Sequence, residues 1–415
     1  MKFRDIGIQM VKLSNLKCWN IQQRDFQIID IEVQDKLNLL SSKKQEIDCS
    51  GLIGIPSGID THVHFREPGF EHKEDMLTGA LTAINGGVTT VLDMANTNPI
   101  TDSVESILQK KKLAEKQQFI DILIASAITN RNYKKLDKID PFCDAYKIFL
   151  PEFEGDLRID EERISISLAS LEEIETGKPI IIQAEDQEII SRYNNKETHQ
   201  KQRPPEAETI AFQKIFNWAK DFRSLKIHAT LLSNSLSIKM LEMTHLPNLT
   251  SDTSFRYLLF DVENVPPEYA AKVNPPFRSK MDRNILLKAF ATGLIEIICS
   301  DHAPHTLEEK AKNNPSGIPG IQEILPTLVT KIKQSELEWD RVIEAFHIFP
   351  AKLLDIEIDN YHARNLVILD ENVPFKISKD WVKTKVKWSA LQGQNMFGRI
   401  HFVIKDGILK LHNTF

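Results

Sequence analysis

The segment Asp60-Thr-His-Val-His-Phe-Arg-Glu-Pro-Gly69 says more about fold and chemistry than any other part of the chain. It follows the apolar run at residues 51–59, which predicts a buried strand. Alternation along that strand places the imidazoles of His62 and His64 on one face, where they suit a divalent metal such as zinc. Arg66 continues the alternation, so the pattern predicts a metal beside a cation that suits a substrate with a carbonyl and a carboxylate. The alternative interpretation is a pair of solvated histidines beside a turn.

From residue 50 onward, short β-rich runs alternate with longer amphipathic stretches. The runs predict strands at residues 52–65, 87–93, 121–127, 145–150, 179–185, 225–230, 248–253 and 295–301. The longer stretches predict helices at residues 73–86, 102–118, 161–177, 206–220, 234–245, 280–293 and 319–334. This alternation predicts an α/β fold, a (β/α)8 TIM barrel. An open doubly wound sheet would also alternate, but polar residues clustered at so many strand ends favour the barrel.

The two ends of the chain differ from its centre. Short alternating runs occur there, for example Phe26-Gln-Ile-Ile-Asp-Ile-Glu-Val33 and Arg399-Ile-His-Phe-Val-Ile-Lys-Asp-Gly407. Neither flank folds easily alone, so we expect a small β-sandwich domain formed from both chain termini. The predicted division is residues 1–50 for its N-terminal part, 51–355 for the barrel and 356–415 for its C-terminal part.

Composition narrows the class of protein. The chain has 415 residues, of which 41% are hydrophobic, and its length suits one barrel with a small satellite domain. No apolar run approaches the ~18 residues of a membrane helix, and the first residues lack the features of a signal peptide. The scattered cysteines favour a reducing cytoplasm, and a net charge of −6 without a basic block argues against nucleic acid. We therefore expect a cytoplasmic protein that acts on a small molecule and binds neither nucleic acid nor membrane.

Polar residues lie where the predicted strands end, and chemistry in such barrels belongs at the C-terminal ends of the strands. The residues at these ends are His62, His64, Lys147, Gln183, His228 and Asp301. Lys147 lies in an apolar run where an unpaired ammonium is costly; the alternative is a lysine that reaches the barrel rim. A carboxylate at the position of Asp301 can contact a metal and take a proton from its bound water.

These strings resemble the dihydroorotases, in the cyclic amidohydrolase group of the amidohydrolase superfamily. The likeness runs from about residue 50 to about residue 355 and includes the His-x-His-Phe-Arg-Glu-Pro-Gly string and Ser300-Asp-His-Ala-Pro-His-Thr306. The resemblance implies a zinc hydrolase that reversibly cyclises N-carbamoyl-L-aspartate to L-dihydroorotate in pyrimidine biosynthesis. It implies that a metal-activated hydroxide attacks the ring carbonyl, with Asp301 as general base and acid.

The resemblance also assigns residues. It implies metal ligands at His62, His64, Lys147, His228 and Asp301, with Gln183 as a further candidate. It implies that Lys147 is carboxylated, so that its carbamate bridges two metals. Substrate contacts are implied for Arg66, Asn96, Asn274, His305, Ser316 and Gly317. At the asparagine, serine and glycine positions, ordinary turn chemistry is the alternative.

The chain departs from the family pattern at two places. The family has His-Ala-Glu at the end of the fifth strand, where this chain has Gln183-Ala-Glu185, and a glutamine carbonyl is a weaker zinc ligand than imidazole. The family's double-histidine string after the seventh strand is replaced by Ser251-Asp-Thr-Ser-Phe-Arg-Tyr257. We therefore expect one tightly bound zinc ion and a second site that is weak or absent.

Several alternatives remain open. Allantoinases and hydantoinases act on rings without the carboxylate that Arg66 would hold, so Arg66 favours a dihydroorotase over them. A non-catalytic dihydroorotase-like subunit that scaffolds aspartate transcarbamoylase is the alternative outside the enzyme class. We expect an active enzyme that forms a homodimer, with aspartate transcarbamoylase as a candidate partner.

Overall fold

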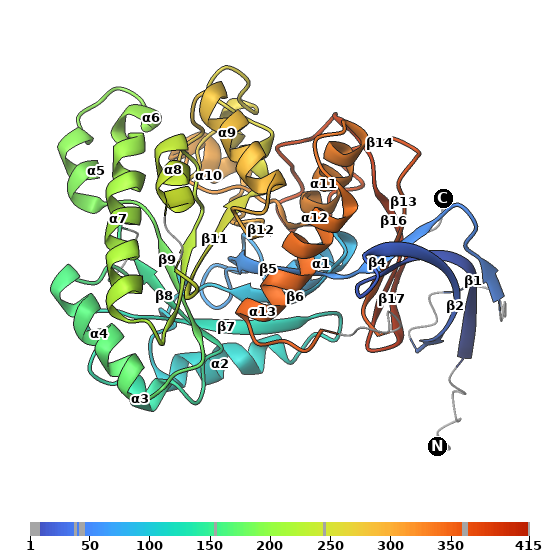
Figure 1. Cartoon of the computed structure of the whole chain (residues 1–415), viewed down its shortest axis with the longest axis horizontal. Coiled ribbons are helices and arrows are strands. Elements are labelled where there is room, and N and C mark those ends of the chain that lie inside the picture. The colour runs from blue at the N-terminus through green and yellow to red at the C-terminus, as the bar shows by residue number, and fades with distance from the viewer. Residues whose placement is uncertain are drawn as a thin grey trace.

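A sheet of eight parallel strands forms the centre of this computed structural model, which describes residues 9–36, 40, 46–152, 156–243, 246–358 and 364–413 (Figure 1). In chain order the strands are β5 (Gly58–Val63), β6 (Val88–Asp93), β7 (Asp121–Ala127), β8 (Ala145–Phe149), β9 (Pro179–Gln183), β10 (Lys226–Thr230), β11 (Leu249–Ser254) and β12 (Ile297–Cys299). A parallel bridge between Val63 and His302 joins the first strand to the end of the last. The sheet therefore closes, and the predicted (β/α)8 barrel is confirmed.

Helices lie outside this sheet, and most of them connect consecutive strands. They are α1 (Met76–Asn85), α2 (Val104–Ala114), α3 (Leu136–Ile139), α4 (Glu161–Glu173), α5 (Gln187–Tyr193), α6 (His199–Gln202), α7 (Pro205–Asp221), α8 (Ser235–Met243), α9 (Lys280–Ala291), α10 (Leu307–Lys312), α11 (Ile324–Lys333), α12 (Trp339–Ile343) and α13 (Phe349–Leu353). Helix α1 begins at Asp75, whose side chain accepts from the amide of Thr78 while the Thr78 hydroxyl accepts from the amide of Asp75. This reciprocal cap fixes where the chain turns from the first strand loop into a helix.

The two flanks of the chain build a second, smaller β domain at one side of the barrel (Figure 1). Its strands are β1 (Gln9–Asn20), β2 (Asp25–Asp35), β3 (Glu46–Asp48), β4 (Ile53–Pro56), β13 (Leu366–Asp370), β16 (Arg399–Lys405) and β17 (Ile408–His412). Because β2 pairs with both β1 and β17, the sheet curls around its own core. The expected small β domain made from both termini is confirmed. A short hairpin of β14 (Phe375–Lys376) and β15 (Asn395–Met396) lies between β13 and β16 in the chain.

The predicted strand at residues 52–65 is in fact two strands. Its first half, β4, pairs with β1 and β13 in the terminal sheet, and its second half, β5, enters the barrel after a break at Ser57. An apolar run does not show this break, because both halves are buried. The domain boundary that we propose at residue 50 therefore leaves one strand of the terminal sheet inside the barrel segment.

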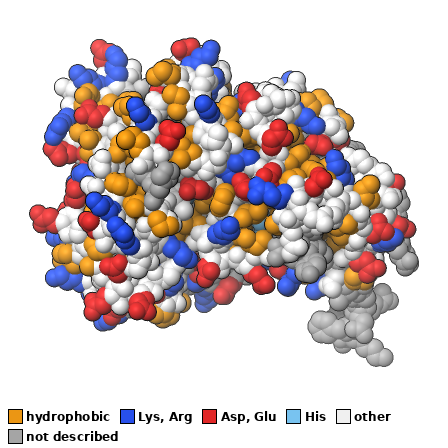
Figure 2. All heavy atoms as spheres, viewed as in Figure 1, with side chains coloured by type: hydrophobic (Ala, Val, Ile, Leu, Met, Phe, Trp, Pro, Cys, Tyr) orange, Lys and Arg blue, Asp and Glu red, His pale blue; other side chains and the backbone are white. Residues whose placement is uncertain are grey.

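The surface of the molecule mixes both signs of charge. On the face shown in Figure 2, lysine and arginine side chains are interspersed with aspartate and glutamate, with hydrophobic side chains between them. Within the part of the chain that the structure describes, none of the helices combines the length and the apolar character needed to cross a membrane.

Candidate metal centre and active site

A cavity of about 420 Å³ opens at the carboxyl ends of the barrel strands. Nine of the predicted site residues line it: His64, Arg66, Asn96, Gln183, Asn274, Asp301, His305, Ser316 and Gly317. The other three, His62, Lys147 and His228, lie deeper in the barrel and are at most 1% exposed. The fold thus brings residues from eight separate segments to one end of the barrel.

His62, His64 and Asp301 form one face of this centre. The Nε2 atoms of His64 and His62 lie 3.2 and 3.8 Å from Asp301 Oδ1. Burial lowers the pKa of both imidazoles, so each ring is neutral and carries one hydrogen. Three donors this close, two neutral imidazoles and a carboxylate, fit a divalent ion.

Neighbouring side chains decide which nitrogen of His62 carries the hydrogen. His62 Nδ1 lies 2.8 Å from the Thr230 hydroxyl, whose own hydrogen is directed to Asp252, so the ring nitrogen donates. The lone pair of His62 Nε2 therefore faces Asp301. Both nitrogens of His64 face an oxygen acceptor: Nδ1 lies 2.5 Å from Asn96 Oδ1, and Nε2 lies 3.2 Å from Asp301 Oδ1.

Two residues of the site have an unusual backbone. Asp301 has φ +46° and Arg66 has φ +66°, in the left-handed region that side-chain-bearing residues seldom adopt. Both lie just beyond a barrel strand, where the chain turns sharply while the side chain stays at the cavity. Such conformations concentrate at functional sites.

Lys147, on β8, is a fully buried amine below the cavity. Its Nζ has no hydrogen-bond partner among the described residues and lies 5.2 Å from the centre of the Phe149 ring. Burial lowers the pKa of Lys147 to about 8, against the opposing attraction of Asp252 and Asp301. A buried ammonium without a hydrogen bond is unfavourable. Either a nearby anion or a chemical modification of Lys147 would stabilise this position.

His228 and Gln183, the residues expected at a second metal site, have other partners. The Asp252 carboxylate accepts from His228 Nε2 at 2.9 Å, and His228 Nδ1 lies 2.8 Å from the Thr250 hydroxyl. Gln183 Nε2 donates to Glu185 Oε2 at 3.3 Å. The nitrogen of His228 that would face a second ion therefore carries a hydrogen.

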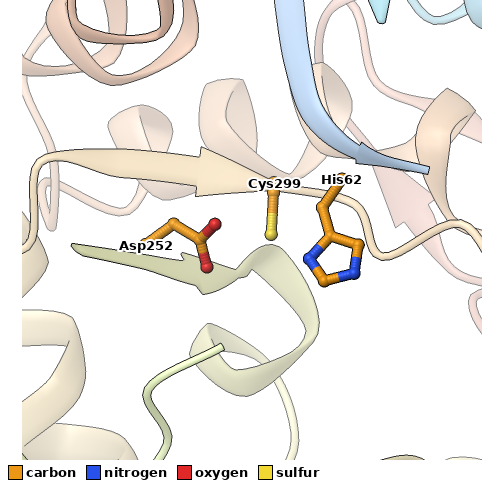
Figure 3. Close-up of side chains that lie close together, drawn as sticks. All are labelled: His62, Asp252 and Cys299. Carbon is orange, nitrogen blue, oxygen red and sulfur yellow. The ribbon is translucent and has the colours of Figure 1, made fainter. Parts of the chain in front are cut away.

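Asp252, on β11, was not singled out by the sequence analysis. Its carboxylate accepts from the Leu231 amide at 2.6 Å and from the Thr230 hydroxyl, in addition to His228. Figure 3 shows it close to His62 of β5 and Cys299 of β12, a further group of candidate donors. Burial raises the pKa of the Cys299 thiol well above its usual value, which makes the thiol a poor ligand. The hydrogen bonds that Asp252 accepts explain the position of its carboxylate better than a metal ion would.

Arg256 is the second residue that the sequence analysis missed. It lies in the short 3-10 helix Phe255–Leu258 directly after β11 and is fully buried. Its Nη1 lies 3.3 Å from Asp301 Oδ2, and its Nη2 donates to the backbone oxygens of Ser300 and Asp301. The string that replaces the family's double histidine contained this residue, but nothing in the string itself indicated that Arg256 would point at Asp301.

The outer wall of the cavity carries the residues expected to bind substrate. Arg66 donates through Nε to the Pro304 oxygen at 3.2 Å, and its Nη2 lies 3.2 Å from His305 Nε2. Burial lowers the pKa of His305, so its neutral ring can accept this hydrogen bond. Asn274 Oδ1 is buried without a hydrogen-bond partner among the described residues and thus has an acceptor to offer.

Two further features complete the wall. Gly317 has φ +122°, and a Cβ there would lie 2.7 Å from the Ala303 oxygen, so this loop position requires glycine. Lys73, which the sequence analysis did not select, also lines the cavity and pairs with Glu309 at 3.1 Å.

Comparison with known proteins agrees with this geometry. Residues 53–360 match the Amidohydrolase family. The chain belongs to the amidohydrolase family. This amidohydrolase is 31% identical to a dihydroorotase of Clostridioides difficile (strain 630), over 87% of this chain and 88% of the relative. It is 29% identical to a dihydroorotase of Methanosarcina acetivorans, over 86% of this chain and 81% of the relative.

Solved structures show the same fold. The L-hydantoinase (dihydropyrimidinase) from Arthrobacter aurescens matches 98% of each chain with a TM-score of 0.85 and 20% identity. A dihydropyrimidinase from Brevibacillus agri matches 97% of this chain and 95% of its own, also with a TM-score of 0.85, at 19% identity. The expected family is therefore confirmed, and the chain is a metal-dependent cyclic amidohydrolase.

Proposed function

We propose that this amidohydrolase is a dihydroorotase, which interconverts N-carbamoyl-L-aspartate and L-dihydroorotate. The observation that carries the proposal is Arg66, a guanidinium fixed against His305 on the wall of the same cavity that His64 and Asp301 line. A ring carboxylate can accept two parallel hydrogen bonds from a guanidinium. Hydantoin and dihydrouracil have no such carboxylate, so a pocket built for them has no use for this cation.

His62, His64 and Asp301 would hold the metal ion, and we propose zinc because the donors are mainly imidazole. A bound divalent ion supplies polarisation of the amide carbonyl and activation of water. Arg66, His305, Asn96 and Asn274 hold the substrate so that its amide lies beside the ion. Asp301 takes a proton from the attacking water and passes it to the leaving nitrogen.

We also propose that Lys147 is carboxylated. The support is its buried Nζ, which makes no hydrogen bond among the described residues although two carboxylates attract it. Carboxylation would turn the Lys147 ammonium into an anion beside the proposed metal site. Intact-mass measurement under native conditions tests this directly, because the carbamate adds the mass of carbon dioxide and is lost in Lys147→Ala.

The substrate is tested with purified, zinc-loaded protein. We expect turnover of dihydroorotate and little or none of hydantoin and dihydrouracil. Arg66→Met should remove the preference for dihydroorotate while the metal content stays unchanged. Comparable turnover of all three rings by the unmutated chain would contradict the proposal. No turnover of any ring, with folded protein, would favour the scaffold alternative, for which the hydrogen bond of His228 Nε2 to Asp252 is the supporting observation.

A cytoplasmic location, a homodimer and a complex with aspartate transcarbamoylase are further predictions. Light scattering of the purified chain, alone and mixed with aspartate transcarbamoylase from the same source, measures the last two.

A further inference from the structure

Arg256 is an internal cation in direct contact with the metal centre. The two oxygens of Asp301 face different partners: Oδ1 faces the imidazoles of His62 and His64, and Oδ2 faces Arg256 Nη1. Two backbone oxygens, those of Ser300 and Asp301, accept from Nη2 and hold the guanidinium in place. Because Arg256 is fully buried, water does not screen its charge.

A second divalent ion would add positive charge beside a buried cation. Arg256 Nη1 already lies 3.3 Å from Asp301 Oδ2, so an ion that shared this oxygen would lie next to a fixed guanidinium. Burial leaves the repulsion between the two unscreened, which is unfavourable.

The side chains expected at a second metal site, His228 and Gln183, also disfavour a second ion. His228 Nε2 carries a hydrogen that it donates to Asp252, and Gln183 takes the place of an imidazole. A second ion would have to remove that hydrogen bond and also lie close to a fixed guanidinium. Both the donors and the charge therefore oppose it.

We propose that the guanidinium of Arg256 takes the place of a second metal ion, so that this chain binds one divalent ion and Arg256 holds the other oxygen of Asp301. Arg256 is thus a positioning residue that acts through Asp301. The proposal rests on the metal dependence of the site proposed above and holds whether or not dihydroorotate is the substrate.

The test is the number of ions bound, measured without any substrate. Metal-free protein is titrated with Zn²⁺ in a calorimeter, and bound zinc is counted by elemental analysis after dialysis. We expect one equivalent for the unmutated chain. Arg256→Met, which removes the charge and keeps the bulk, should bind a second ion at least about tenfold more tightly than the unmutated chain does. Arg256→Lys, which keeps the charge, should behave as the unmutated chain.

Arg341→Met is the matched control. Arg341, on α12, is also a buried guanidinium, and it donates to the backbone oxygens of Phe290 and Ile295. It does not line the cavity. It should lose stability without a change in the number of ions bound. A second tight ion in the unmutated chain, no bound ion at all, or identical titrations of Arg256→Met and the unmutated chain would each overturn the proposal.

A measurement on the unmutated chain keeps the test decisive if Arg256→Met does not fold. Loaded with Mn²⁺, the protein should give the electron paramagnetic resonance spectrum of an isolated ion. A spin-coupled pair overturns the proposal. Loss of dihydroorotate turnover with one ion bound would count against the proposed substrate alone.

Discussion

Histidines on the two sides of the metal centre differ in their hydrogen bonds. One side is formed by β5, which ends with His62 and His64 nearby, and the other by β10, which carries His228. On the β5 side, Thr230 holds the hydrogen of His62 on Nδ1, which leaves the lone pair of its Nε2 directed toward Asp301. On the β10 side, Asp252 holds the hydrogen of His228 on Nε2. An imidazole binds a metal only through a nitrogen without hydrogen. The outer hydrogen-bond partners, and not the presence of histidine, therefore separate a metal-binding side from a side closed by internal hydrogen bonds.

The largest difference between the sides should appear when a donor is removed. His62→Ala or Asp301→Ala should lower kcat/KM for dihydroorotate at least about a thousandfold, about 4 kcal/mol, because the ion loses its ligands. His228→Gln should retain one equivalent of metal. Initial rates and elemental analysis measure both effects. Activity within about tenfold of the unmutated chain, about 1.4 kcal/mol, in His62→Ala or Asp301→Ala would mean that the β5 side is not the working metal site.

Arg66 tests the substrate wall next to the β5 side. Arg66→Lys should lower kcat/KM for dihydroorotate at least about tenfold, mainly through KM, because lysine keeps the charge but loses the planar fork. The exposed Arg192→Lys on α5 is the control and should leave the rate unchanged. An unaltered kcat/KM for Arg66→Lys would make Arg66 a structural residue.

A substitution on the β10 side can make it bind a metal ion more as the β5 side does. Gln183→His supplies an imidazole and should raise the affinity for a second ion severalfold, less than Arg256→Met does, because the guanidinium and the Asp252 hydrogen bond stay in place. Metal content after dialysis measures this change. Two equivalents retained by the unmutated chain would show that the second site is not weak.

The smallest effect is expected from a substitution of Trp388, which contacts the loop that carries His305. The indole of Trp388 donates to the His305 oxygen at 2.8 Å and so positions the loop that carries the partner of Arg66. Trp388→Phe removes a bond worth about 1 kcal/mol and should raise KM about fivefold with kcat unchanged. Trp339→Phe is the control, since its indole donates to Glu371 in another part of the molecule. A lower kcat with KM unchanged would remove Trp388 from substrate positioning.

The sequence predicted the barrel because local patterns carry the information. Alternating β-rich and amphipathic runs reflect which faces are buried, and the eight strands lie where these patterns place them. The apolar run predicted β4 and β5 as a single strand, because burial on both sides hides the change from one sheet to another. Its alternation placed His62 and His64 on one face, since strand alternation is a local rule.

By itself, the sequence determined the fold, the family strings and the residue types that reach the barrel's C-terminal end. Only the tertiary structure decided what those residues do. Whether His228 offers a lone pair depends on Asp252, and whether Asp301 shares its charge depends on Arg256; these partners lie 24 and 45 residues away along the chain. Hydrogen-bond direction and buried charge act through space, so no pattern of neighbouring residues records them.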